Sequence, residues 1–401
     1  MATCHRTASG NWHDENWDTV PGAADDADLN GYSVTLDSAN VTVNSISSST
    51  AGASLTIDGP TLTVSNIIDV GDNITLTIAS GTVVCADLTT SPSAGTRVLI
   101  TGGSLTVGQI SNSAGSTPAI EMSGGNLTVI NGGGTGPLLR MYGGTASIGG
   151  QLDLQNCSMQ CIDLNSGTLN FNNATVLNLN HQVLYQLGGT VSGQITRGDS
   201  GTRTNYLCYV GAGTISNLTI ACSVGSSDMY PVIMIFGTAA ASSLTLSGTI
   251  DDGAMTSFLD YRSPNSSSII LDLTVGVGTC GIYQTDGGLT ITGSAYIAQG
   301  GALVYRMDTA GSLYIQASLN VHILGVICYS EVAGDTGVHY NPPSQPNVLT
   351  IYSTGMPVAL EEADYPEARN IRSGVTARHG SIIGTMTSGG GLRTHLEHIF
   401  G

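Results

Sequence analysis

The chain has 401 residues, of which 41% are hydrophobic, 10% are charged and 54 are glycine. An average domain is roughly 25% charged, and this apolar content is too high for a disordered chain. The formal net charge is −18, and all eleven basic residues are arginine. Because nucleic-acid binding needs a basic stripe that displaces counterions, we expect no nucleic-acid partner.

Residues 1–45 contain both tryptophans of the chain, Trp12 and Trp17, and a strand is expected at residues 32–36. The first coil of a stacked β-fold leaves an open strand edge, which pairs with other chains unless something covers it. We therefore expect Trp12, Trp17 and Pro21 to form an N-terminal cap. Sugar stacking by the tryptophan pair is the alternative interpretation.

The order of residues in this opening is distinctive. Trp17 is followed by Pro21-Gly22, then by Asp25, and then by Val34-Thr35. This order resembles the entry segment of bacterial and phage β-helix surface proteins. The resemblance implies a parallel β-helix and does not imply a particular activity.

Residues 46–353 carry a short repeated phrase, Gly-x-Leu-Thr-Val/Ile, at loose intervals, most of them about 19–29 residues. In each copy the two aliphatic side chains point to one face of the strand and the Thr points to the other. A repeat this short cannot bury its apolar face alone, so its coils must stack on one another. The copies begin at Ser54, Asn73, Gly103, Gly125, Gly144, Gly167, Gly189, Gly213, Ser243, Gly288 and Gly311.

The expected fold is all-β: a single-stranded right-handed parallel β-helix, or β-solenoid, with an N-terminal cap and a short C-terminal assembly segment. The handedness is inferred from the variable spacing, because a left-handed hexapeptide helix would need strict six-residue phasing. The expected boundaries are 1–45 for the cap and first strand, 46–353 for the stack, and 354–401 for the C-terminal segment.

Residues 354–401 differ in composition from the stack. A charged region is followed by the glycine-rich segment 388–391 and then by residues 392–400, which have helical periodicity. So short a helix is unstable alone in water and must dock on its own chain or on another. We expect this segment to hold copies together or attach them to a larger particle, through Arg372, Arg378, Leu392, Leu396, Ile399 and Phe400.

Part of this C-terminal region has a second resemblance. Residues 370–376 read Asn-Ile-Arg-Ser-Gly-Val-Thr, with Pro366 before them and Gly380 and Gly384-Thr385 after them. The pattern is similar to a segment near the ends of phage tail-fibre and virion-surface proteins and of some planctomycete-like surface proteins. Ala377-Arg378-His379 replaces the aromatic-Gly step of that pattern. The resemblance implies a surface protein of this kind.

The eight cysteines are scattered, and most lie in apolar segments where they are expected to be small buried hydrophobes. Cys157 and Cys161 lack the second pair that a zinc site needs. His395 and His398 lack a third ligand. An acidic patch lacks the loop pattern of a calcium site. We therefore expect no metal and no cofactor. The acidic patch comprises Asp14, Glu15, Asp25, Asp26 and Asp28.

A polysaccharide hydrolase would need two carboxylates facing one groove. The candidates are Asp153 with Asp163, and Asp251 and Asp252 with Asp260. A lyase would need a base near acidic ligands, and the chain has no lysine. No nucleophile elbow, P-loop or dinucleotide motif is present. We therefore expect no enzymatic activity and name no catalytic residue.

The chain begins Met-Ala-Thr-Cys-His-Arg with no apolar signal-peptide core, which predicts synthesis and folding in the cytoplasm. No apolar run is long enough to span a bilayer, so no membrane partner is expected. The leading hypothesis is a non-enzymatic structural protein of a phage virion surface: a head decoration protein, tail fibre or spike shaft.

This hypothesis includes homotrimers, contacts with other virion or surface proteins, and a glycan receptor as a further partner. The alternatives are an extracellular or cell-surface β-helix, acting as an adhesin or as a coat or filament protein, and a glycan-degrading tailspike.

Overall fold

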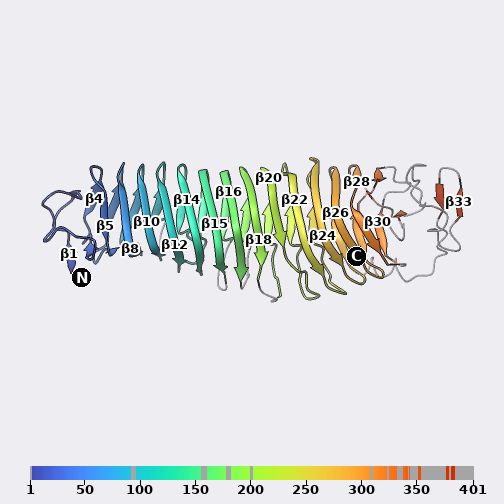
Figure 1. Cartoon of the computed structure of the whole chain (residues 1–401), viewed down its shortest axis with the longest axis horizontal. Helices are drawn as coiled ribbons and strands as arrows, with labels where there is room; N and C mark the ends of the chain where they lie inside the picture. The colour runs from blue at the N-terminus through green and yellow to red at the C-terminus, as the bar shows by residue number, and fades with distance from the viewer. Residues whose placement is uncertain are drawn as a thin grey trace. The chain divides into compact units, whose positions relative to one another are not determined.

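The structure, a computed structural model, describes residues 2–91, 96–154, 160–177, 182–198, 202–307, 310–322, 325–331, 337–341 and 343, and the backbone of three further strands, 351–353, 376–378 and 381–383. The described strands form a parallel β-solenoid of about 14 turns (Figure 1). This confirms the expected all-β parallel solenoid, whereas its handedness stays a prediction. No helix long and apolar enough to cross a membrane occurs among the described residues.

Residue contacts divide the chain into two compact units, Met1–Asp199 and Ser200–Gly401. The boundaries expected from composition, after residues 45 and 353, stay predictions. The strands of the first unit are β1 (Thr3–His5), β2 (Gly10–Asn11), β3 (Asp26–Asp28), β4 (Ser33–Leu36), β5 (Val41–Val43), β6 (Ser45–Ser47), β7 (Ala53–Ile57), β8 (Thr61–Asp69), β9 (Ile74–Ile78), β10 (Thr82–Thr90), β11 (Val98–Ile100), β12 (Ser104–Asn112), β13 (Ile120–Met122), β14 (Asn126–Gly134), β15 (Leu139–Asp153), β16 (Ile162–Leu177), β17 (Leu184–Gln186) and β18 (Thr190–Arg197).

The second unit has its own set of strands. They are β19 (Cys208–Val210), β20 (Thr214–Ala221), β21 (Ile233–Ile235), β22 (Ala240–Ile250), β23 (Leu259–Tyr261), β24 (Ser267–Val275), β25 (Cys280–Gln284), β26 (Leu289–Ile297), β27 (Ala302–Arg306), β28 (Leu313–Ile315), β29 (Ser318–Val321), β30 (Val326–Ser330), β31 (Val338–Tyr340), β32 (Ile351–Ser353), β33 (Thr376–Arg378) and β34 (Ser381–Ile383). The last two pair antiparallel as a hairpin.

From β4 and β5 onward the strands of the first unit pair in two rows, one short and one long, whereas β1, β3 and β6 form a further row that joins β8. The short row runs through β4, β7, β9, β11 and β13, and the long row runs through β5, β8, β10, β12 and β14. β15 and β16 extend both rows. The second unit has a short row that includes β21, β23, β25, β27 and β30 and a long row that includes β20, β22, β24 and β26.

Alternation along each strand separates a filled lumen from the outer surface. In β9 the pattern from Ile74 to Ile78 alternates buried and half-buried residues. Leu76 pairs with Leu55 on one side and with Val98 on the other, and all three side chains are 0% exposed. Each buried aliphatic side chain contributes roughly 1.5–3 kcal/mol of hydrophobic stabilisation. The predicted inward orientation of the aliphatic residues is thus confirmed.

The repeated phrase occupies both rows of the first unit. The copies at Ser54 and Asn73 lie on β7 and β9 of the short row, whereas the copy at Gly103 opens β12 of the long row. The interval between the copies at Asn73 and Gly103 is long because the second of them lies in the other row. In the long row β12 pairs with β10 (Thr82–Thr90), which pairs in turn with β8 (Thr61–Asp69). The sequence pattern missed both β10 and β8.

Coil length varies while neighbouring strands stay paired, with β-bulges or irregularities between some paired segments. Asn126 pairs with Ser104, 22 residues before it, and with Thr145, only 19 residues after it. The long strands bend between two buried segments, and left-handed residues make the bend: Asn173 has a φ of 53° and Gly193 a φ of 99°. At Gly193 a Cβ atom would lie 2.0 Å from the Phe171 carbonyl oxygen, so only glycine fits there.

We predict that Leu76→Ala destabilises the protein by about 2–5 kcal/mol, because it opens a cavity in the lumen between two neighbouring coils. Thr77→Ala is the matched control, because Thr77 is the adjacent outward-facing residue and is only half-buried. The measurement is the denaturant midpoint of unfolding, followed by far-ultraviolet circular dichroism. Equal midpoints for the two variants would contradict the assignment of Leu76 to the lumen.

Candidate functional site

The two tryptophans form one buried cluster at the start of the chain. Trp12 is 1% and Trp17 is 6% exposed, and their ring centroids lie 5.0 Å apart. The indole Nε1 of Trp17 donates a hydrogen bond of 2.9 Å to the Trp12 carbonyl oxygen. Pro21 is buried as well. Sugar stacking would need exposed ring faces, so this burial favours a packing role for the pair.

Arg6 lies fully buried against this cluster. Its guanidinium carbon is 5.1 Å from the centroid of the Trp17 ring, within the range of a cation–π interaction. Its Nη2 forms a 2.8 Å ion pair with Asp14, and its Nε donates to the Ala8 carbonyl oxygen at 2.7 Å. Burial lowers the pKa of Arg6, and the Asp14 carboxylate opposes that shift. Through these contacts Arg6 connects the tryptophan cluster to Ala8 and Asp14.

Residues 16–18 lie along the outer edge of β1. Arg6 and Trp17 form an antiparallel bridge. The Asp18 N–H donates to the His5 carbonyl oxygen at 3.0 Å, and the Thr7 N–H donates to the Asn16 carbonyl oxygen at 2.9 Å. These bonds occupy backbone groups that an edge strand would otherwise leave unpaired.

The aspartates of the N-terminal acidic patch accept hydrogen bonds from neighbouring protein groups. Asp28 accepts from the Ser49 N–H and hydroxyl at 2.9 and 2.7 Å and lies 2.9 Å from the His5 ring. Asp26 accepts from the side chains of Asn44 and Ser45. Among the described residues, no group of three or more His, Cys, Asp or Glu side chains is arranged to hold a metal ion.

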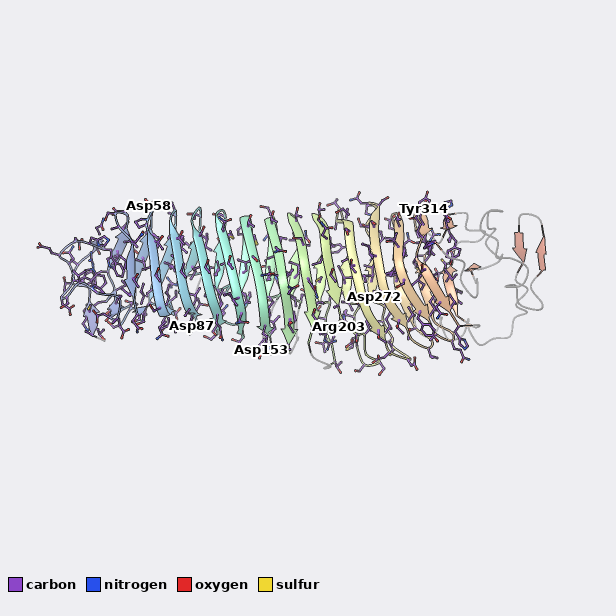
Figure 2. All side chains as sticks on the ribbon, in the orientation of Figure 1. Asp58, Asp87, Asp153, Arg203, Asp272 and Tyr314 are labelled. Carbon is purple, nitrogen blue, oxygen red and sulfur yellow. The ribbon has the colours of Figure 1, made fainter. Side chains whose placement is uncertain are left out.

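The carboxylates considered for a hydrolase lie in different parts of the coils. Asp153 is in the long row, at the lower edge of Figure 2, whereas Asp163 is in the short row with Arg140 at 3.3 Å. Asp251 and Asp252 are exposed in the corner after β22, and Asp260 lies on β23. Because neither set is gathered in one groove, this geometry adds no support to the hydrolase alternative.

The structure brings together an aromatic cluster in the second unit that the sequence interpretation missed. The Tyr206 ring centroid lies 5.5 Å from that of Tyr209 and 5.2 Å from that of Tyr230. The Tyr209 ring centroid in turn lies 4.4 Å from that of Phe236. The Phe236 ring covers Gly211 so closely that a Cβ atom added to Gly211 would lie 2.7 Å from the Phe236 Cζ atom. We call these four aromatic residues the aromatic platform.

The corner that carries Tyr230 is anchored by a buried ion pair. Arg203 and Asp228, with side chains 0% and 1% exposed, lie 3.2 Å apart (Arg203 is labelled in Figure 2). The Asp228 carboxylate also accepts the N–H of Gly225 at 3.0 Å, and the Met229 N–H donates to the Arg203 carbonyl oxygen. Removing one partner of a buried pair costs about 3–5 kcal/mol, so this corner is held firmly.

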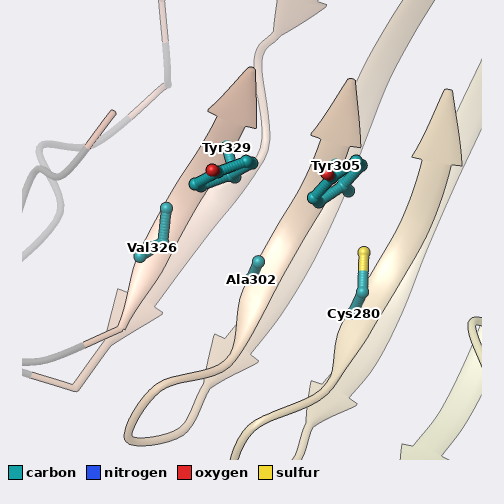
Figure 3. Packing of buried hydrophobic residues seen from close by; sticks show 5 residues of the cluster. All are labelled: Cys280, Ala302, Tyr305, Val326 and Tyr329. Atoms are coloured by element: carbon teal, nitrogen blue, oxygen red, sulfur yellow. The ribbon is translucent and has the colours of Figure 1, made fainter. Parts of the chain in front are cut away.

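A charged pair and a tyrosine ladder lie on the same short row. Arg262 donates to Asp260 through Nε and through Nη2, the latter at 2.7 Å, and its side chain is 48% exposed. Tyr283, Tyr305 and Tyr329 are stacked on successive strands with centroids 5.4 and 5.0 Å apart. Figure 3 shows Tyr305 and Tyr329 as members of one buried cluster with Cys280, Ala302 and Val326.

The cysteines of the described part are buried, as predicted from their apolar surroundings. They are Cys4, Cys85, Cys161, Cys208, Cys222, Cys280 and Cys328. Burial raises the pKa of the Cys85 thiol to about 12, with a smaller effect from Asp87, and burial also raises that of Cys280 to about 12. Such thiols stay protonated near neutral pH and are poor nucleophiles.

Most of the proposed attachment residues lie outside the described residues. These are Arg372, Leu392, Leu396, Ile399 and Phe400, together with His395 and His398 and the helix expected around them. Arg378 ends β33, of which only the backbone is described. The attachment role of this segment stays a prediction.

We predict that Asp28→Asn lowers the free energy of unfolding at pH 7 by about 2 kcal/mol, because it removes a buried charged acceptor. Burial alone would raise the Asp28 pKa, but the hydrogen bonds from Ser49, Asn30 and His5 bring it below the ordinary value of 3.8. The ionised Asp28 carboxylate therefore contributes its full share to the free energy of unfolding above about pH 5. This contribution is lost as the pH falls from the unfolded-state pKa of 3.8 toward the lower pKa of the folded state.

The measurement is the denaturant midpoint of wild type and Asp28→Asn from pH 7 to pH 3, with Asp25→Asn, at a less buried position, as control. The Asp28 variant should lose less stability on acidification than wild type. Parallel curves for the two proteins would contradict the role assigned to Asp28.

We predict that Cys85 and Cys280 resist iodoacetamide in the native protein at neutral pH and react in guanidinium chloride, because only unfolding exposes and ionises them. Peptide mass spectrometry after timed labelling measures this. Native labelling of either residue at the rate of a free thiol would show that the coil around it is open.

No protein family model matches this chain, and neither a curated protein nor a solved structure is significantly similar to it.

Proposed function

We propose that this protein is a non-enzymatic structural component of a phage virion surface, as a head decoration protein, a tail fibre or the shaft of a spike. The observation that carries the proposal is the parallel solenoid itself, whose in-register coils enclose a lumen of fully buried aliphatic residues. A tightly packed lumen resists deformation. A rigid body of this kind displays its outer surface without any chemical step.

The charge of the chain supports a display role. The net charge is −18 with no lysine, which favours solubility and mutual repulsion of exposed surfaces. In this proposal the protein is made in the host cytoplasm, assembles with other virion proteins and binds a glycan receptor.

The N-terminal cluster would protect one end of the stack. Burial of Trp12, Trp17 and Pro21 and the backbone bonds of residues 16–18 to β1 support this role. A covered edge does not recruit strands from other chains, and solenoids need such ends for solubility.

The C-terminal segment, residues 354–401, would provide attachment and hold three copies together through Arg372, Arg378 and the apolar residues from Leu392 to Phe400. The alternative is a bacterial cell-surface or filament β-helix, an adhesin or coat protein, for which the same solenoid would serve. A glycan-degrading tailspike is the second alternative.

We expect the full chain to have a solution mass about three times its chain mass of 41.0 kDa, and a variant ending at Ser388 to be monomeric. The reason is that the removed residues carry the apolar face expected to dock between copies. Multi-angle light scattering gives both masses, and circular dichroism confirms that the shortened chain stays folded. If both proteins are monomers, the self-assembled shaft is contradicted; if both are trimers, docking through residues 389–401 is contradicted.

A further inference from the structure

We propose that the aromatic platform of the second unit, together with the Asp260–Arg262 pair beside it, binds a neutral oligosaccharide. This inference rests on the proposed surface role for its biological setting. The site itself is argued from the side chains that make it.

The platform offers ring surface that solvent can reach. Tyr230 is 39% exposed, and Tyr206, Tyr209 and Phe236 are half-buried, so each ring is held on one side and open on another. Their edge-on and tilted packing, at centroid distances from 4.4 to 5.5 Å, fixes the rings relative to one another. Sugar rings present C–H faces to such surfaces, and tyrosine hydroxyls bind sugar hydroxyls.

Hydrogen-bonding groups lie next to the rings. Arg262 is 48% exposed while Asp260 is 6% exposed, so the guanidinium keeps N–H groups toward solvent after binding the carboxylate. Burial raises the pKa of the Tyr206 hydroxyl, and the charge of Asp260 adds to the shift. The strand pairing places the charged pair near the platform: Tyr209 of β19 pairs with Met234 of β21, and Met234 pairs with Asp260 of β23.

The charges select a neutral ligand. Among the described residues, the two arginines near the platform, Arg262 and Arg203, are each paired with a carboxylate, at 2.7 and 3.2 Å, and the chain carries a net charge of −18. An anionic polysaccharide would meet repulsion and no free positive charge, whereas a neutral one needs only stacking and hydrogen bonds. We therefore expect affinity that changes little with salt.

The platform is prepared before binding. Tyr230 belongs to the corner fixed by the buried Arg203–Asp228 pair, and Phe236 lies in the space left by Gly211. Rings that are already ordered lose little conformational freedom when a ligand binds, which favours affinity. If the aromatic platform served only to stabilise the solenoid, its outermost ring, that of Tyr230, would not need to be exposed.

The test is isothermal titration calorimetry of the full chain with three neutral hexasaccharides, from a β-1,4-glucan, an α-1,4-glucan and an α-mannan, and with an oligogalacturonate as the anionic comparison. At least one neutral sugar should bind with an affinity unchanged between about 50 and 300 mM salt. Tyr206→Ala and Tyr230→Ala should weaken binding about tenfold each.

Tyr142→Ala is the matched control, because Tyr142 is a 50% exposed tyrosine in the first unit, and it should bind as wild type does. Tyr206→Phe keeps the ring and should retain most of the affinity. Thermal melts of all variants establish that they are folded.

Three results would overturn the proposal. They are no binding of any neutral hexasaccharide, salt-dependent binding of the anionic sugar alone, or a fall in solution mass in Tyr206→Ala and Tyr230→Ala, which would make the platform an interface between copies. The Ser388 truncation tests the surface-assembly function separately. Sugar binding by a monomeric full chain would leave this inference standing while removing the trimer.

Discussion

In-register hydrogen bonding between neighbouring parallel strands is the constraint on which the rest of the structure depends. Each coil repeats the backbone path of its neighbour, so a residue such as Leu76 must lie between its counterparts Leu55 and Val98. Paired positions therefore form columns of side chains across the coils, and an inward column such as Leu55, Leu76 and Val98 is buried throughout. The lumen, the tyrosine ladder and the need to cover the outer edge of β1 are all consequences of this one condition.

Alternation of aliphatic and polar residues was enough to predict the solenoid and the inward side chains, because strand geometry places every second residue on the same face. It could not tell which row a phrase belongs to, since Leu55-Thr56-Ile57 and Leu105-Thr106-Val107 are almost identical yet lie in different rows. The local sequence pattern determines which side chains face the lumen and which face outward. The row in which a strand lies depends instead on the length of the corners between strands.

The candidate sites were predictable to different degrees. The tryptophan cluster could be singled out because both tryptophans lie within one short segment, although its contact with Arg6 required the structure. The aromatic platform left a weaker trace, because, of its residues, only Tyr209 lies in the column of the short row that also contains Tyr283. Its assembly depends on Gly211 and on the Arg203–Asp228 pair, which come from different coils and share no motif.

Coil length varies while neighbouring strands stay paired: Asn126 and its partner Thr145 are 19 residues apart, whereas Thr214 and its partner Ala240 are 26 residues apart. The extra residues are absorbed where the chain turns. Insertions can therefore accumulate in one corner without altering the coils above and below it. Natural selection can act on the exterior of such a protein coil by coil, while its interior stays under a single, nearly uniform restriction.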